Sequence, residues 1–234
     1  MSGLPFHSAV ATGRGDDGTT GLLFGGDRVY KDDLRTEAFG AVDEAVAALG
    51  LARAELAHMD AGLARAELAH VGTAPAPSPA FAGLANLVLR LQRELFVVGA
   101  ELATAPGARD RGRDGETRVS GAMMDDMDAI LREMEAAIEL PREFVVPGET
   151  RASAALEMAR TILRRAERRS VTLALHDETL AAGRLLPYLN RLADLLWILA
   201  RVAEQGEARE ATVARPGRRA ATGPRPAPPQ RSTP

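Results

Sequence analysis

The segment from Pro187 to Gln205 constrains the fold of this chain more than any other. Its apolar side chains recur every three or four residues, the spacing that places them on one face of an α-helix. They are Leu189, Leu192, Leu195, Leu196, Leu199 and Val202. Pro187 suits the first turn of such a helix, where its missing N–H is no loss. Because the apolar face is so broad, we expect this helix to lie deep within a bundle.

Four more segments show the same period and are separated by stretches rich in glycine, proline and charged residues. We expect helices from Thr36 to about residues 59–62 and over about residues 81–104, 120–139 and 151–175. The composition agrees, because 46 % hydrophobic residues with only 4 % aromatics is typical of helical proteins. The predicted fold class is therefore all-α, a five-helix bundle preceded by a glycine-rich N-terminal segment.

The composition divides the chain into three regions. We expect a glycine-rich segment over residues 1–35, a helical bundle over residues 36–205 and a disordered tail over residues 206–234. The tail holds six of the 14 prolines and lacks the apolar groups that would offset its ordering entropy. It also carries six arginines against two glutamates, so the net charge of −3 hides a more acidic body. Such a body, without interleaved basic and aromatic residues, argues against nucleic-acid binding.

An identical nine-residue sequence, GLARAELAH, occurs at residues 50–58 and again at residues 62–70. The offset of twelve residues advances a helix by three turns and about 120°, so the two copies cannot turn the same face toward one core. We therefore expect the first helix to stop near Met59–Gly62. The second copy would be held loosely, and the proline-rich residues after it would form a linker.

Several classes of protein are excluded by what the chain lacks. It contains no cysteine, which rules out disulfides and thiolate metal ligands. No apolar run reaches the length of about 20 residues that a membrane helix needs. The N-terminus has neither the basic start nor the apolar core of a secretory signal. We expect a soluble, cytoplasmic protein with no membrane partner.

The run ATGRGDDGTTGLLFGGDRVYK, residues 11–31, is rich in glycine and contains Lys31, the only lysine of the chain. Gly13, Gly15 and Gly18 have the G-x-G-x-x-G spacing of dinucleotide-binding folds, but the context lacks the required strand and helix. A P-loop is excluded because the lysine does not follow the last glycine. Glycines still allow backbone N–H groups to approach anionic oxygens closely. The segment is therefore either a phosphate-binding loop or a flexible arm.

Arg160, Arg164 and Arg168 recur every four residues and must lie along one side of the fourth predicted helix. Guanidinium groups pair with phosphate in bidentate fashion and always stay charged. Two interpretations remain open for this arginine stripe. It is either a clamp for a discrete polyphosphate or a solvated face whose charge is offset by Glu157 and Glu167.

The last predicted helix also carries polar residues within its apolar pattern, namely Asn190, Asp194 and Arg201. Polar side chains that are buried must find hydrogen-bond partners. We expect either an Asn–Asp network between helices or an Asn190 side chain that reaches a ligand beside the arginine stripe.

Six segments, spanning about residues 12–203, resemble the PduO-type ATP:cob(I)alamin adenosyltransferases in their order and residues. They are TGRGDDGTTGL with RVYKDD, GAVDEAVAALG, LFVVGAELAT, FVVPGE, ARTILRRAERR and YLNRLADLLWILAR. The resemblance implies a homotrimer of five-helix bundles with each active site between neighbouring subunits. It implies an enzyme that transfers the 5′-deoxyadenosyl group of ATP to the cobalt of a reduced corrinoid, cob(I)alamin or cob(I)yrinic acid a,c-diamide, and releases triphosphate.

The resemblance also assigns an ATP site. Its implied residues are Thr12, Gly13, Arg14, Gly15, Asp16, Gly18, Thr19, Thr20, Gly21, Lys31, Arg164, Arg165, Glu167, Arg168 and Asn190. Among them, Lys31, Arg164 and Arg168 would stabilise the leaving triphosphate. No protein acid, base or nucleophile is implied, because reduced cobalt is itself the nucleophile. Magnesium would be bound through ATP, with no metal ligand assigned to the protein.

The same resemblance implies roles for four more residues. Asp43 and Arg160 would form an ion pair across the subunit interface, and Phe96 and Trp197 are candidates for the corrinoid side. The loop over residues 106–119 holds no aromatic residue to shield the lower face of the corrinoid, and Gly13-Arg14 replaces the usual Lys-Thr.

The implied partners are a corrinoid reductase and an adenosylcobalamin-dependent mutase. Two alternative functions stay open. One is an escort protein that holds adenosylcobalamin without turnover, and the other is a plain helical oligomer whose arginines are solvated.

Overall fold

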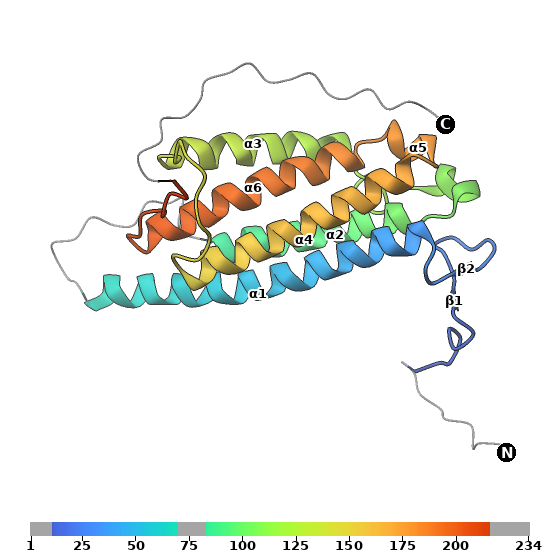
Figure 1. Cartoon of the computed structure of the whole chain (residues 1–234), viewed down its shortest axis with the longest axis horizontal. Coiled ribbons are helices and arrows are strands. Elements are labelled where there is room, and N and C mark those ends of the chain that lie inside the picture. The colour runs from blue at the N-terminus through green and yellow to red at the C-terminus, as the bar shows by residue number, and fades with distance from the viewer. Residues whose placement is uncertain (1–10, 70–82, 216–234) are drawn as a thin grey trace.

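The computed structural model describes residues 11–69 and 83–215 of the chain. Five long helices lie side by side along the long axis of the molecule (Figure 1). They are α1 (Leu34–Ala69), α2 (Leu84–Ala103), α3 (Gly121–Ala137), α4 (Arg151–Ala174) and α6 (Leu185–Gly206). The smaller elements are a 3-10 turn (Pro106–Arg111), α5 (Glu178–Ala181) and the antiparallel strands β1 (Thr19–Thr20) and β2 (Val29–Tyr30). The predicted all-α, five-helix bundle is therefore confirmed.

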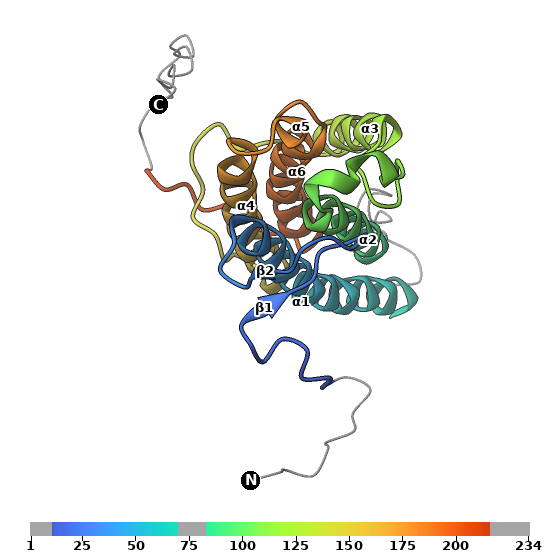
Figure 2. The same cartoon turned by 90° about the vertical axis from the view of Figure 1, so that its right-hand side faces the viewer.

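Helix α6 contributes more to the core than its neighbours do, as its sequence predicts. All six of its predicted core residues, from Leu189 to Val202, are buried. It packs against α4 and α3, while α1 packs against α4 and α2. Figure 2, which looks along the bundle, shows these helices gathered around one core.

Local sequence signals set the starts of α3 and α4. The Ser120 hydroxyl accepts a hydrogen bond from the Met123 N–H at 3.1 Å. Thr150 and Ser153 form a reciprocal capping box. Each cap satisfies backbone donors that the first helical turn leaves without partners. Both starts lie within one residue of the prediction.

Helix α1 differs from the prediction at both ends. It begins at Leu34, and Asp33 rather than Thr36 caps it, because the Asp33 carboxylate accepts from the Arg35 N–H at 2.8 Å. It also continues through the second sequence copy to Ala69 instead of stopping near Met59–Gly62. Met59 is still buried, and nothing in the sequence after it breaks a helix, since the single glycine, Gly62, costs only about 1 kcal/mol.

The predicted disordered tail is only partly described, and its described part is ordered. Residues 207–215 turn back after α6 and pair with the loop between α3 and α4, where Val213 bridges Val145. The composition predicted disorder because the tail has few apolar side chains, but backbone hydrogen bonds form without them. Residues 216–234 and the predicted linker lie outside the described residues.

The glycine-rich segment over residues 11–33, which we call the leader, leaves the bundle near the start of α1. Strands β1 and β2 form a small hairpin within the leader. The tip of the leader projects away from the bundle (Figures 1 and 2). None of the helices within residues 11–69 and 83–215 is both long and apolar enough to cross a membrane.

Candidate functional site

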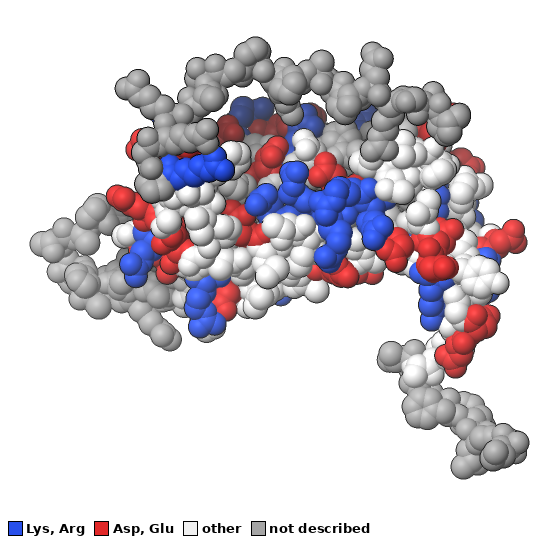
Figure 3. Space-filling view, in the orientation of Figure 1, with Lys and Arg blue, Asp and Glu red and all other residues white. Residues whose placement is uncertain are grey.

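The exposed arginines of α4 form a continuous basic patch. Arg164, Arg165, Arg168 and Arg169 are all exposed, and Figure 3 shows a broad blue surface across the middle of the molecule. Arg165 pairs with Glu44 of α1, and Arg169 lies 3.6 Å from a carboxylate oxygen of Glu37. Within the described part of the chain, the guanidinium groups of Arg164 and Arg168 form neither a hydrogen bond nor an ion pair. The patch therefore has one neutralised edge, along α1, and one edge with free guanidinium groups.

The free edge of the patch faces a pocket of about 330 Å³ between α3, α4 and α6. Its lining residues are Leu131, Glu135, Arg160, Arg164, Ala193, Asp194, Trp197 and Ile198. Charged groups of both signs line it, and Trp197 supplies an apolar part of its wall. Such a site can hold a ligand that combines anionic groups with a flat apolar part.

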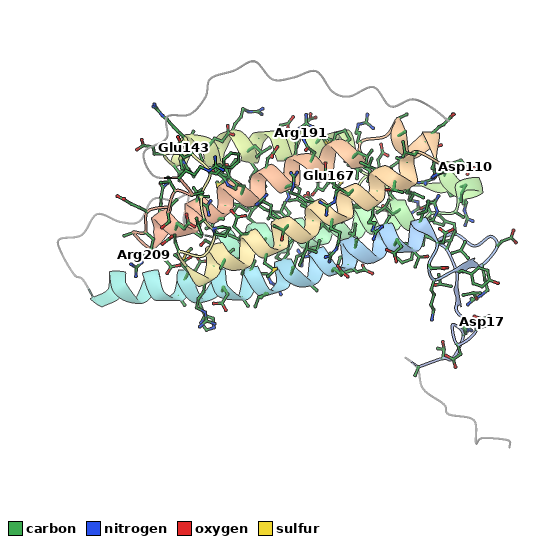
Figure 4. All side chains as sticks on the ribbon, viewed as in Figure 1. Asp17, Asp110, Glu143, Glu167, Arg191 and Arg209 are labelled. Atoms are coloured by element: carbon green, nitrogen blue, oxygen red, sulfur yellow. The ribbon has the colours of Figure 1, made fainter. Side chains whose placement is uncertain are left out.

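Glu167 lies among the free arginines, at the centre of the face in Figure 4. Partial burial raises the pKa of its carboxyl, and the nearby Asp194 carboxylate adds to this, while Arg164 and Arg168 oppose it. The two carboxylates therefore moderate the positive charge of the patch at a distance, without direct ion pairs to Arg164 or Arg168 in the described chain. A polyanion that binds here can pair with the guanidinium groups of Arg164 and Arg168 without displacing an existing ion pair.

A buried ion cluster supports the pocket from below. Arg201 is 1 % exposed, and its Nε lies 2.7 Å from Glu204 and its Nη1 lies 3.4 Å from Glu157. The Arg201 guanidinium also lies 5.5 Å from the centre of the Trp197 ring, within cation–π range. Arg160 donates to Glu157 from the pocket side at 2.7 Å. Arg160 and Trp197 are thus both held by the same cluster.

This cluster corrects the prediction for the polar residues of α6. Only Arg201 is buried, while Asn190 and Asp194 are exposed. No Asn–Asp network forms among the described residues. The spacing does place these residues on one helix face, but that face is exposed at Asn190 and Asp194 and buried at Arg201.

The leader folds into a compact loop of its own. Lys31 donates from Nζ to the Gly15 carbonyl at 2.8 Å, and Arg28 donates from Nη2 to the Arg14 carbonyl at 2.6 Å. Asp17 accepts from the N–H and hydroxyl of Thr19, which lowers the pKa of its carboxyl. Lys31 approaches so closely that a Cβ on residue 15 would lie 3.0 Å from Nζ, so any larger residue there would force the Lys31 side chain to shift. Arg28, whose hydrogen bonds close this loop, was not predicted from the sequence.

The base of the leader is fastened to the bundle by two sets of contacts. Leu23 exchanges backbone hydrogen bonds with Ala103 and Ala105 at 2.8 and 3.3 Å. The Arg111 guanidinium lies over the Phe24 ring, 4.8 Å from its centre. The leader therefore leaves the bundle at a fixed place, although its tip projects beyond it.

Two arginines, one buried and one partly buried, share a carboxylate at the neighbouring corner of the bundle. Arg35, the second residue of α1, and Arg109 both donate to one carboxylate oxygen of Asp177, at 2.9 and 2.6 Å. Burial raises the pKa of Asp177, but these two hydrogen bonds outweigh it and hold the pKa below its ordinary value. This node joins the start of α1 to the 3-10 turn and to α5.

The structure brings the predicted site residues together in two separate groups. One group is the leader, with Thr12 to Gly21 and Lys31, and the other is the α4–α6 face with Arg164, Arg168 and Asn190. Figure 4 shows the separation through Asp17 in the leader and Glu167 on α4. Within one chain the two groups do not meet.

The remaining predicted residues are also dispersed. Asp43 is exposed on α1, partial burial raises the pKa of its carboxyl, and it has no partner in residues 11–69 and 83–215. Phe96 is 66 % exposed on α2, which lines no part of the pocket. Of the two aromatic candidates, only Trp197 lines it. In the described ranges, no group of three or more His, Asp or Glu residues is arranged to hold a metal ion.

Phe144 is a residue to which the sequence analysis gave no role. It lies in the loop between α3 and α4 and is 88 % exposed, and Val146 beside it is 46 % exposed. Alternating residues of an extended chain point to the same side, so the two apolar side chains form one exposed patch. An aromatic residue next to the Pro147-Gly148 turn was the available signal.

Comparison with known proteins gives the chain close relatives along nearly its whole length. The family model described as cobalamin adenosyltransferase matches residues 10–203. A corrinoid adenosyltransferase of Citrobacter freundii is 36 % identical over 199 residues, which cover 83 % of this chain and 94 % of that protein. One of Bacillus subtilis (strain 168) is 36 % identical over 191 residues, covering 82 % and 84 %. The PduO protein of Salmonella typhimurium is 34 % identical over 210 residues, but only 53 % of it is covered.

Solved structures agree with these relatives. A phenylalanine-to-alanine variant of a PduO-type ATP:corrinoid adenosyltransferase from Lactobacillus reuteri, complexed with cobalamin and ATP, superimposes with a TM-score of 0.67 at 25 % identity. The match covers 87 % of this chain and 98 % of that one. Family, identity and fold lead to the same conclusion: the chain belongs to the cobalamin adenosyltransferase family.

Proposed function

We propose that this chain transfers the 5′-deoxyadenosyl group of ATP to the cobalt of a reduced corrinoid, cob(I)alamin or cob(I)yrinic acid a,c-diamide. In this reaction the cobalt(I) electron pair forms a bond to C5′, the C5′–oxygen bond breaks, and its electron pair leaves with triphosphate. One observation carries the proposal. In a chain of this family, the side chains of Arg164 and Arg168 have no partner among the described residues, and Arg164 lines a pocket with an apolar wall.

The residues of the chain need only position and stabilise the reactants. No proton moves, so no acid or base is needed, and fixing C5′ in line with cobalt contributes as much as about 7–11 kcal/mol. Arg164, Arg168 and Lys31 would stabilise the charge that grows on the departing triphosphate. Magnesium would be held by phosphate oxygens, as is usual for this ion.

We infer that each ATP site is shared between two subunits of a homotrimer. The leader of one subunit, with Thr12, Gly13, Arg14, Gly15, Asp16, Gly18, Thr19, Thr20, Gly21 and Lys31, would face the helical face of the next, with Arg164, Arg165, Glu167, Arg168 and Asn190. What supports this is that the leader is fastened at its base yet projects from its own bundle. Both groups expose the polar atoms that a phosphate chain requires.

Asp43 and Arg160 are proposed to form an ion pair across the same interface. Glu157 holds Arg160 from below, which leaves part of its guanidinium exposed. Asp43 is an exposed carboxylate without a partner in the described chain. A second copy could supply each with its opposite charge.

On the corrinoid side we propose Phe144 ahead of Phe96, with Trp197 as part of the pocket wall. In the Lactobacillus reuteri protein, the variant phenylalanine of one structure and the variant arginine of another are twenty residues apart. Phe144 and Arg164 have that same separation, and no other phenylalanine of this chain is followed by an arginine at that distance. An exposed aromatic ring is also suited to cover the flat face of a corrinoid.

The decisive experiment incubates the chain with ATP, magnesium and chemically reduced cobalamin. We expect the spectrum of adenosylcobalamin to appear together with an equal amount of triphosphate. Release of phosphate would indicate ordinary hydrolysis, and corrinoid binding without a cobalt–carbon bond would leave only the escort function. The cytoplasmic location, the reductase and the mutase stay predictions.

A further inference from the structure

The chain after α6 is attached to the loop between α3 and α4. Beyond the helix the backbone reverses at Ala208, which has a φ of 53°, while the Arg209 N–H donates to the Glu204 carbonyl at 2.9 Å. Residues 212–214, which we call the strap, then run antiparallel to residues 144–146. The Ala214 N–H donates to the Phe144 carbonyl at 2.7 Å, and the Val146 N–H donates to the Thr212 carbonyl at 2.8 Å.

The loop that receives the strap is long and has few other supports. Residues 138–150 connect α3 to α4 with no helix of their own, and connections of this length are usually functional. Besides the strap, the Gln205 side chain donates to the Glu139 carbonyl at 3.0 Å. These hydrogen-bond supports come from the C-terminal end of α6 and the residues just beyond it, while Ile138 and Leu140 at the start of the loop pack against the core.

The Phe144 ring cannot hold itself in place by packing. It is 88 % exposed, so few atoms of the chain touch it. Its position therefore depends on its backbone. The Phe144 carbonyl oxygen accepts one of the two hydrogen bonds that join the loop to the strap. Without the strap, this residue would regain the conformational freedom that loop residues have in solution.

We propose that the strap is a positioning element for the corrinoid, which holds Phe144 and Val146 in the orientation needed to contact it. The inference rests on the proposed function only for the identity of the ligand. The strap touches neither the arginine patch nor the leader in the described chain, so its effect should be confined to the corrinoid.

The test replaces a single backbone donor in the full chain. Ala214→Pro removes the N–H that donates to Phe144, while Ala214→Ser keeps it and serves as the matched control. Loss of one hydrogen bond corresponds to a change of about three- to ten-fold. We expect the proline variant to raise the KM for the corrinoid by that factor, with the KM for ATP and the serine variant unchanged.

A second pair of variants separates the strap from the rest of the C-terminus. A chain that ends at Arg215 keeps the strap, whereas a chain that ends at Arg209 lacks it. Only the shorter chain should show the raised corrinoid KM. Equal corrinoid KM values for the two chains, or a parallel loss for corrinoid and ATP, would overturn the proposal.

Two further readouts distinguish failure of this inference from failure of the proposed function. Hydrogen exchange at the Val146 amide should accelerate in Ala214→Pro and not in Ala214→Ser, whether or not the chain is an enzyme. Absorbance titration with cob(II)alamin and ATP then measures corrinoid binding without turnover. If the wild-type chain binds cob(II)alamin but forms no adenosylcobalamin, only the proposed reaction is refuted. If cob(II)alamin binding is unchanged in Ala214→Pro, the proposed role of the strap is refuted.

Discussion

Arg160 donates a hydrogen bond from Nε to the carboxylate of Glu157, 2.7 Å away. Glu157 is 3 % exposed, and its other carboxylate oxygen lies 3.4 Å from the buried Arg201. A single carboxylate therefore connects an arginine of the pocket to the ion cluster in the core. Changes in that cluster should affect both the stability of the bundle and the geometry of the pocket.

We expect Glu157→Gln to lower the free energy of unfolding by about 3–5 kcal/mol, because it removes one partner of a buried charge network and leaves Arg201 less compensated. Glu55→Gln is a suitable control, since the Arg151 that pairs with Glu55 is 86 % exposed, and its loss should be below about 1 kcal/mol. Urea denaturation of both variants checks this. Equal losses of unfolding free energy in the two variants would show that the burial of the Glu157 network does not add to the stability of the protein.

Arg164→Ala should lower kcat/KM for ATP by about 10²–10³-fold, because a preorganised cation beside the leaving group is removed. Arg169→Ala removes the same charge from the same helix, but Arg169 pairs with Glu37 on the far edge of the patch. Steady-state kinetics should show less than about a three-fold change for that variant. Similar losses in the two variants would mean that the patch attracts ATP only through its total charge.

Lys31→Ala and Arg164→Ala should complement each other if the site is shared between subunits. Each variant alone should be nearly inactive, since every site lacks one group. Co-expressed at equal amounts, they should recover roughly a quarter of the wild-type activity, because that fraction of neighbouring pairs combines an intact leader with an intact Arg164. Purified mixed oligomers assayed for adenosylcobalamin check this. No recovery would favour a site within one chain.

Asp177→Asn should destabilise the protein at pH 7 by about 3 kcal/mol, since the buried Arg35 and the partly buried Arg109 lose their shared carboxylate. Arg35 and Arg109 hold the pKa of Asp177 below its ordinary value of 3.8. The stabilisation is therefore present above that value and is lost as the pH falls through the lower, folded-state pKa. The stability difference between wild type and variant should accordingly shrink below about pH 4, as measured by urea unfolding at several pH values.

A control for this prediction is available at an exposed pair. Asp114 lies 2.6 Å from Arg118, but both side chains are about half exposed. Asp114→Asn should change the free energy of unfolding by less than about 1 kcal/mol at any of these pH values. A pH-dependent loss as large as that of Asp177→Asn would contradict the assignment of the effect to the buried node.

Most of the bundle could be predicted from the sequence because helices arise from local periodicity. Ser120 and Thr150 mark helix starts through their own side chains, and the apolar face of α6 indicates its place in the core. The end of α1 could not be predicted in this way, since leaving the core and ending a helix are different events. Met59 lies on the apolar period and is buried, but nothing in the residues after it requires the backbone to stop there.

For the candidate site, the sequence indicated which arginines share a helix face, but not what surrounds them. Helical spacing placed Arg160, Arg164 and Arg168 on one face, which the structure confirms by their order along α4. The same spacing grouped Asn190 and Arg201, yet one is exposed and the other is buried. Helical spacing specifies the face of the helix on which a side chain lies. Whether that side chain is buried depends on which other helices pack against the face at that point.

What the sequence by itself determined is therefore the set of helices, the arginine stripe and the glycines of the leader, all of which depend on residues within a few positions of one another. Only the tertiary structure decided that the strap would pair with Phe144 and that Glu157 would join Arg160 to Arg201. Such contacts join residues far apart in the chain. Backbone hydrogen bonds and buried charges acquire their partners only when the helices pack, so no local pattern encodes them.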